Sequence, residues 1–198
     1  MPKFKAYRTF EENKVVSSRF VEMTIDELDT GEVVIKAKYS TINYKDALSH
    51  NGAGRIMRKY PTNAGIDMAG TVESSADARW KRGDKVIVHA YDMGVAHDGV
   101  YGEYVRVPAD WVVRRPESMT AFDAMTLGTA GFTAAHAIML MERNGLAPDK
   151  GPVAVTGARA ERKAWVSVAA CTATTRRSAS SRPCSDATSR PPAITTSS

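Results

Sequence analysis

Apolar and polar residues alternate along several short stretches in the first part of the chain. In Gly31–Ser40 the residues at 33, 35, 37 and 39 are apolar, and this period of two predicts a half-buried β-strand. Further stretches that predict strands are Phe4–Phe20 (one or two strands), Met68–Val72, Lys85–Ala90 and Tyr101–Val107. The turns between them contain Gly and Asp, which favours a mainly β, partly open barrel-like domain over residues 1–119.

Helical patterns interrupt this domain once and then follow it. A loop leads into a short helix over Asn43–His50, with Ala47 and Leu48 predicted to face inward. Thr120 is a suitable N-cap for a second helix. The apolar residues of 132–143 lie three to four positions apart and are Phe132, Ala135, Ile138 and Met139. Asn144-Gly145 predicts the end of that helix.

A short apolar run, Pro152–Thr156, predicts a buried parallel strand after the helices. A helix followed by such a strand is how an α/β domain begins, so residues 120–157 are expected to be its start. The residues after Gly157 differ in kind: of 41 residues, 9 are Ala, 8 Ser, 6 Thr and 6 Arg. This composition cannot bury enough apolar surface to offset the entropy of ordering. We expect a disordered, low-complexity basic tail over 158–198.

The charge of the chain is confined to this tail. Residues 1–157 carry 20 basic and 20 acidic side chains, whereas the tail carries 7 and 2. The net charge therefore gives no sign that the body binds nucleic acid, and such a partner is not expected. A non-catalytic β module that binds a partner or nucleic acid through its basic tail stays open as an alternative.

Metal and membrane sites are not expected. Cys171 and Cys184 are the two cysteines and both lie in the tail, so residues 1–157 have no Cys-based zinc site. The N-terminus lacks the apolar core of a signal peptide, and no apolar run approaches the ~20 residues of a membrane span. We expect a cytoplasmic protein.

The four histidines lack ligand spacing and are predicted to be surface or packed residues: His50, His89, His97 and His136.

Five motifs carry a family resemblance. They are Thr41–Leu48 (TINYKDAL), Asn63–Val72 (NAGIDMAGTV), Arg82–Val86 (RGDKV), Gly102–Tyr104 (GEY) and Leu127–Ala134 (LGTAGFTA). In this order and spacing they resemble the medium-chain dehydrogenase/reductase superfamily, in its zinc-independent, quinone-oxidoreductase-like branch. The chain is most similar there to the acrylyl-CoA reductase family of the YhdH/YhfP type. The resemblance covers residues 1–157.

The resemblance implies a GroES-like catalytic domain followed by the truncated start of a Rossmann domain. It also implies NADPH as the cofactor, and reduction of the carbon–carbon double bond of acrylyl-CoA or a similar small-molecule enoyl-CoA or enone. Intact relatives are expected to be homodimers. An NADPH:quinone oxidoreductase is the alternative within the enzyme class.

The strongest candidate for the catalytic centre is Asn43-Tyr44-Lys45. Hydride transfer to an enoyl thioester leaves an enolate oxygen, which amide, hydroxyl and ammonium donors stabilise. The resemblance implies that Tyr44 lies against the nicotinamide, with Asn43 and Lys45 beside it. The alternative is a loop tyrosine packed on the barrel, with Asp46 capping the helix.

Other segments are candidates for cofactor contacts. Asp67 could place a carboxylate in the cleft, but a structural role in orienting a neighbouring loop is favoured. Thr129, Gly131 and Thr133 lie at a helix start, where free N–H groups suit an anion; the resemblance implies that they approach the cofactor. A tight packing corner between domains is the alternative there.

Thr156 and Gly157 would end the first Rossmann strand and contact NADPH. A glycine-rich loop should follow, because only glycine lets the backbone approach a pyrophosphate. Instead the chain continues with the charged run Arg159–Lys163, which predicts a solvated face. We therefore expect this chain to bind NADPH poorly.

A shift of reading frame after Ala158 would explain the break. Out-of-frame reading of a GC-rich gene yields Arg, Ala, Ser, Pro and Thr. GC-rich codons can be chosen for Thr174–Ser181 that read Glu-Val-Gly-Val-Val one base over, which resembles a second Rossmann strand. A genuine disordered tail is the alternative.

Overall fold

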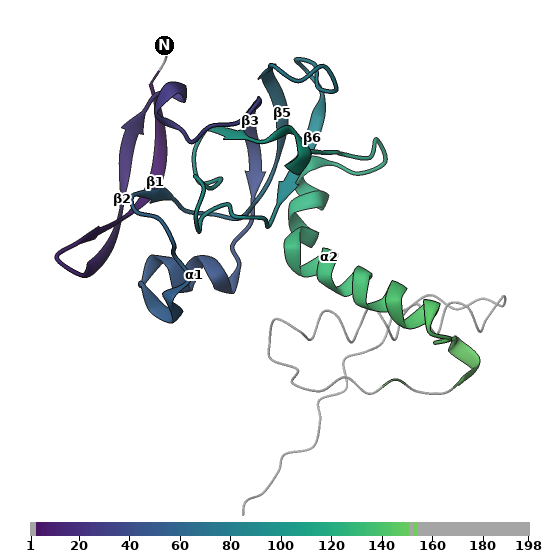
Figure 1. The fold of residues 1–198 in the computed structure, drawn as a ribbon. Coiled ribbons are helices and arrows are strands. Elements are labelled where there is room, and N and C mark those ends of the chain that lie inside the picture. The colour runs from purple at the N-terminus through teal and green to yellow at the C-terminus, as the bar shows by residue number, and fades with distance from the viewer. Residues whose placement is uncertain (1–2, 151–152, 154–198) are drawn as a thin grey trace, which may run out of the picture. The chain divides into compact units, whose positions relative to one another are not determined.

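The structure is a computed structural model that describes residues 3–150 and residue 153 (Figure 1). The strands are β1 (Phe4–Glu12), β2 (Val15–Met23), β3 (Val33–Ser40), β4 (Thr62–Asn63), β5 (Asp67–Ser75), β6 (Lys85–His89), β7 (Tyr104–Val107) and β8 (Val113–Arg114). The α-helices are α1 (Tyr44–His50) and α2 (Ala121–Arg143), and the 3-10 turns are η1 (Ile25–Glu27), η2 (Ala53–Arg55), η3 (Ala109–Trp111) and η4 (Pro148–Lys150). The chain divides into one compact unit up to Ala137 and another from Ile138.

Two antiparallel sheets form the first unit. One has the strand order β2-β1-β4 and the other β7-β3-β5-β6-β8. β1 and β2 form a hairpin whose two-residue turn, Asn13-Lys14, has positive φ at both positions, the backbone that matches the twist of paired strands. The mainly β domain expected from the alternating stretches is confirmed, including the strands predicted before Phe20.

The main core lies on one face of the larger sheet. Its members come from alternate strand positions, as the period of two requires: Val33, Ile35, Met68, Val72, Val86, Val88, Val105 and Val107 are among them. A smaller cluster around Phe4 and Met23 lies under the hairpin. The two sheets are joined where the Phe4 ring meets the Tyr104 ring edge-on, with centroids 5.5 Å apart, and where Ala6 bridges to Gly102.

The opposite face of the larger sheet holds the start of α2. Ala121, Ala124 and Met125 pack on Ala69 of β5. Thr120 forms a capping box with Asp123: its N–H and hydroxyl donate to Asp123 Oδ2, and the Asp123 N–H donates back to Thr120 Oγ1 at 3.1 Å. The N-cap predicted at Thr120 is confirmed.

α2 is two helical segments that meet at Gly128. Gly128 has φ 52° and ψ −161°, which is not helical. A Cβ at this position would lie 2.9 Å from both Asp67 Oδ2 and Thr41 Cγ2, so only glycine fits. The far end of α2 closes as expected at Gly145, whose φ is +90°. The Leu146 N–H donates to the Met141 carbonyl at 2.9 Å, which completes a Schellman cap.

The inner face expected for α1 is wrong at Ala47. The helix buries Asp46 and Ser49, whereas Ala47 is exposed and Leu48 is half-buried, because the Asp46 carboxylate turns inward to accept the Tyr101 hydroxyl. The helical spacing predicted over 132–143 is that of α2, on which Phe132 is 54% exposed and Met139 39%.

α2 is also the one helix in the described residues that is long and apolar enough to cross a membrane by length and composition. A single such helix is weak evidence, because helices of soluble proteins meet the same criterion. The helix is interrupted at Gly128, and its first segment packs on Ala69 of β5. We therefore interpret this segment as part of the β domain rather than as part of a membrane span.

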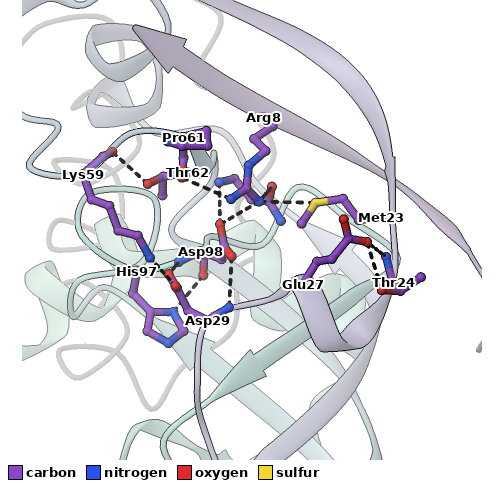
Figure 2. Close-up of polar contacts among 11 residues, drawn as sticks. Arg8, Met23, Thr24, Glu27, Asp29, Lys59, Pro61, Thr62, His97 and Asp98 are labelled. Atoms are coloured by element: carbon purple, nitrogen blue, oxygen red, sulfur yellow. Dashed lines mark hydrogen bonds and ion pairs between the residues drawn. The ribbon is translucent and has the colours of Figure 1, made fainter.

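A buried ionic network fixes the loops at the edge of the smaller sheet (Figure 2). Asp98 is 1% exposed and accepts Arg8 Nη1 at 3.1 Å, the Asn63 N–H at 2.9 Å and the Asp29 N–H at 3.1 Å. Asp29 in turn binds the Asp98 N–H and the Lys59 ammonium. Each carboxylate therefore has both a cation and backbone donors, the condition under which buried charge is tolerated.

The expected Rossmann strand lies outside the described residues apart from Val153. The expectations for the tail over 158–198 lie wholly outside them.

Candidate active site

Asp67 is the centre of a buried hydrogen-bond network that joins three segments distant in sequence. It begins β5 and is fully buried. Its Oδ2 accepts Asn43 Nδ2 at 2.8 Å and the Thr129 N–H at 2.9 Å, and its Oδ1 accepts the Thr129 hydroxyl. The carboxylate thus caps the second segment of α2 and holds the Asn43 amide in one orientation. The structural role expected for Asp67 is what these contacts give it.

Asp46 and Tyr101 form a second polar pair next to this network. Asp46 Oδ2 accepts the Asn43 N–H at 2.7 Å and the Tyr101 hydroxyl at 3.1 Å. Burial raises the pKa of the Asp46 carboxyl, and the charge of Asp67 acts in the same direction. Burial, followed by the Asp46 charge, likewise raises the pKa of Tyr101. Asp46 is therefore the helix cap that the alternative interpretation anticipated, and Tyr101 ties that cap to the barrel.

The remaining two residues of the Asn43-Tyr44-Lys45 motif point outward. Tyr44 is 65% exposed and Lys45 is exposed as well. The expected alternative, in which Tyr44 packs on the barrel, does not fit this exposure. The motif thus combines a fixed amide at Asn43 with a phenol and an ammonium that are both accessible.

The second segment of α2 begins close to Asn43, because the Asp67 carboxylate accepts hydrogen bonds from both Asn43 and Thr129. The first N–H of this segment, that of Thr129, is bound to the Asp67 carboxylate rather than free for an external anion. The Thr133 hydroxyl donates to the Thr129 carbonyl at 2.8 Å. A Cβ at Gly131 would come 2.8 Å from Leu127 Cβ, so this glycine allows the two helical segments to meet.

These contacts bear on whether a nicotinamide cofactor would fit. The negative charge of Asp67 disfavours a phosphate at Thr129 but is compatible with the uncharged carboxamide of a nicotinamide ring. The described residues therefore suit the nicotinamide end of the cofactor. Thr156 and Gly157, predicted for the pyrophosphate end, lie outside the described residues.

A groove of about 620 Å³ adjoins the Asp46–Tyr101 pair, because Tyr101 is among its lining residues. Aromatic and aliphatic side chains line most of it, among them Tyr7, Phe20, Tyr39 and Ile42. None of the residues predicted for the site lines it, so we do not assign the site to this groove. Across residues 3–150 and 153, no group of three or more His, Cys, Asp or Glu side chains could hold a metal ion.

Comparisons with known proteins agree with this fold. A family model, the alcohol dehydrogenase GroES-like domain, matches residues 29–117. Acrylyl-CoA reductase AcuI of Ruegeria pomeroyi is 47% identical over 148 residues, which cover 75% of this chain and 45% of that protein. YhfP of Bacillus subtilis is 46% identical over 155 residues, 78% of this chain and 47% of its own. This part of the chain belongs to the medium-chain dehydrogenase/reductase superfamily, in its zinc-independent, quinone-oxidoreductase-like branch, where it is similar to proteins named acrylyl-CoA reductase.

Solved structures of the superfamily give the same result. The crystal structure of B. subtilis YhfP with NAD bound has a TM-score of 0.74 and 44% identity over 76% of this chain and 46% of its own. The YhdH oxidoreductase of Salmonella enterica in complex with NADP has a TM-score of 0.72 and 35% identity over 74% of this chain and 45% of its own. The chain spans about half the length of the relatives it matches. The GroES-like fold predicted by the resemblance is confirmed.

Sequence reasoning missed three features of the site. The pairing of Asp46 with Tyr101 spans 55 residues, and no local pattern indicates it. The sequence predicted two helices, but it gave no sign that they follow each other directly, with the non-helical Gly128 as the single break between them. The bond from Asp67 to Thr129 was also missed, although a carboxylate next to a helix start is a combination that chemistry favours.

Proposed function

We propose that this chain carries the substrate-binding part of the active site of an NADPH-dependent reductase. The enzyme would act on the carbon–carbon double bond of acrylyl-CoA or a similar enoyl thioester. The observation that carries the proposal is the Asn43 amide, fixed by the fully buried Asp67 carboxylate next to the exposed Tyr44 and Lys45. The relatives named acrylyl-CoA reductase, and the NADP- and NAD-bound structures of the same fold, support it.

The chemistry divides between cofactor and protein. The cofactor, when bound, supplies a hydride to the β-carbon. The chain's own residues have to stabilise the enolate oxygen that results and to allow protonation at the α-carbon. The Asn43 amide commits one hydrogen to Asp67, so it is pre-oriented, and the Tyr44 hydroxyl and Lys45 ammonium are donors accessible to a ligand.

We assign the cofactor contacts in two groups. Tyr44, Thr129, Gly131 and Thr133 would lie against the nicotinamide end, as the charge of Asp67 favours. Thr156 and Gly157 would face the pyrophosphate, but the residues after them offer no glycine-rich turn. This 198-residue chain is therefore expected to be cofactor-deficient, and homodimer formation and a cytoplasmic location stay predictions.

A quinone is the second candidate substrate. A chloroplast quinone-oxidoreductase homologue of Spinacia oleracea is 31% identical over 124 residues, and the donors of the site would suit a quinone oxygen equally well. Steady-state rates with crotonyl-CoA and with a quinone would separate the two in any catalytically complete form of the protein.

Titration of the purified chain with NADPH tests the cofactor deficiency. We expect no saturation of the binding signal up to millimolar NADPH, measured by calorimetry. Micromolar affinity would show that the residues beyond Gly157 do form a cofactor site. Sequencing the gene across codons 155–170 tests the frame shift separately, and an intact frame that is also present in the transcript would refute it.

A further inference from the structure

His89 lies beside the Asp67 network and has no role in it. It is the last residue of β6 and is paired directly opposite Asp67 on β5. Directly opposed residues of an antiparallel pair project from the same face of the sheet, with Cβ atoms ~5 Å apart. That face is the one on which Ala69 holds the start of α2. His89 therefore stands on the face of the sheet where Asp67 binds Asn43 and Thr129.

The His89 ring is held by an aromatic contact rather than by hydrogen bonds. Its centroid lies 4.9 Å from that of Phe132, in an edge-to-face arrangement. Phe132 is in turn stacked on His136 at 5.8 Å. Within the part of the chain that the structure describes, His89 Nδ1 is buried and has no hydrogen-bond partner. The side chain is only half-buried, so the accessible edge of the ring carries Nε2.

We propose that His89 is a further ligand-contacting residue of the site, with its Nε2–H donating to the carbonyl oxygen of an acyl thioester. The inference rests on the function proposed above. A buried N–H without an acceptor is rarer than an acceptor without a donor. We therefore expect the Nε2–H tautomer of His89, in which the buried Nδ1 carries no hydrogen and the Nε2–H faces the ligand.

This donor would supply what the Asn43 amide alone does not. One amide hydrogen of Asn43 is bound to Asp67, and the enolate oxygen formed by hydride addition gains from more than one donor. His89 needs no change of protonation for this role, because it only donates a hydrogen bond. Phe132 fixes the plane of its ring, and the buried Nδ1 edge fixes which nitrogen faces outward.

NMR on the full chain, labelled uniformly with ¹⁵N so that histidine rings and side-chain amides are both observed, tests the inference. The probe is S-butyryl-N-acetylcysteamine, a saturated acyl thioester, which has no double bond to which a cysteine thiol could add. We expect the free chain to show the Nε2–H tautomer of His89 and a saturable shift of its ring signals on titration. His97, whose ring nitrogens lie 3.1 Å from the carbonyl oxygens of Asp98 and Thr30, is the internal control and should not respond.

A variant checks the same point by affinity. His89→Phe keeps an aromatic ring against Phe132 and removes the donor, and it should bind the thioester about fivefold more weakly, the effect of one neutral hydrogen bond. Thioester-dependent shifts at the Asn43 amide without any at His89, or an Nδ1–H tautomer, would overturn the role of His89 and leave the proposed function intact. No saturable shift at any residue would overturn both.

Discussion

At the scale of single residues, the candidate site depends on two carboxylates for which structural roles were expected, Asp67 and Asp46. Asp67 receives three donors, from Asn43 and from the backbone and hydroxyl of Thr129. An amide has one acceptor oxygen, so no amide can replace this carboxylate. The Asp46 carboxylate accepts the backbone N–H of Asn43. Asn43 is therefore held through its main chain by Asp46 and through its side chain by Asp67.

Asp67→Asn should destabilise the fold and release the Asn43 amide. The new amide nitrogen would face donors, so we expect a loss of about 2 kcal/mol in the free energy of unfolding, measured by urea denaturation. Thr129→Val, which removes one donor and keeps the side-chain shape, should cost less. An unchanged free energy of unfolding in Asp67→Asn would show that the three contacts do not stabilise the domain.

The buried Asp46 predicts a dependence of stability on pH. A carboxyl whose pKa is raised by folding stabilises the fold fully below its unfolded pKa, and this contribution is lost as the pH rises through the folded-state value. Burial raises the pKa of Asp46, so Asp46→Asn should gain in stability relative to the wild type as the pH rises above about 4. Denaturation curves at several pH values measure the unfolding free energy of both proteins. An Asp46→Asn variant that gains no stability relative to the wild type as the pH rises, or that loses it, would contradict the assignment.

At the scale of elements, the strands were predictable and the way in which the helices are joined was not. Alternation with a period of two located β3 and β7, because one face of the larger sheet is buried. Other short stretches, bounded by turn signals that contain Gly and Asp, predicted strands at β1, β2, β5 and β6. β4 and β8 have two residues each, too few for any pattern to register. The inner face predicted for α1 was wrong at Ala47, because the buried Asp46 occupies that face and accepts a hydrogen bond from Tyr101. The break in α2 depends on contacts of Gly128 with residues 61 and 87 positions earlier, which no local period reveals.

Gly128→Ala tests the junction within α2. The alanine would have to adopt a backbone conformation reserved for glycine and would meet Asp67 and Thr41 at 2.9 Å. Strain and overpacking together should cost about 2–4 kcal/mol of unfolding free energy. Gly83→Ala is the matched control, since Gly83 has φ +94° but open space around its Cβ position. Equal losses in the two variants would mean that the contacts with Asp67 and Thr41 are unimportant.

At the scale of the whole molecule, the chain combines a complete GroES-like fold with about half the length of the relatives it matches. The motif order was enough to predict the family, and composition alone placed the net charge in residues 158–198. The site could be predicted only in part. Asn43, Tyr44 and Thr129 follow from motifs, and Asp46 was anticipated as a helix cap. Tyr101 joins them through a hydrogen bond that spans 55 residues, and His89 through its pairing with Asp67, neither of which the sequence displays.

On the function proposed above, residues 1–157 carry a competent substrate-binding part of the enzyme and lack only the means to hold the cofactor. Joining these residues to the second half of B. subtilis YhfP, and following NADPH oxidation with acrylyl-CoA, tests this division. We predict acrylyl-CoA-dependent turnover that falls about 100-fold on Asn43→Ala, the scale of losing one oxyanion donor, with Ser17→Ala on the exposed strand β2 as the unaffected control. A folded, NADPH-binding chimera without acrylyl-CoA-dependent turnover, or one that Asn43→Ala leaves unchanged, would contradict the proposed function.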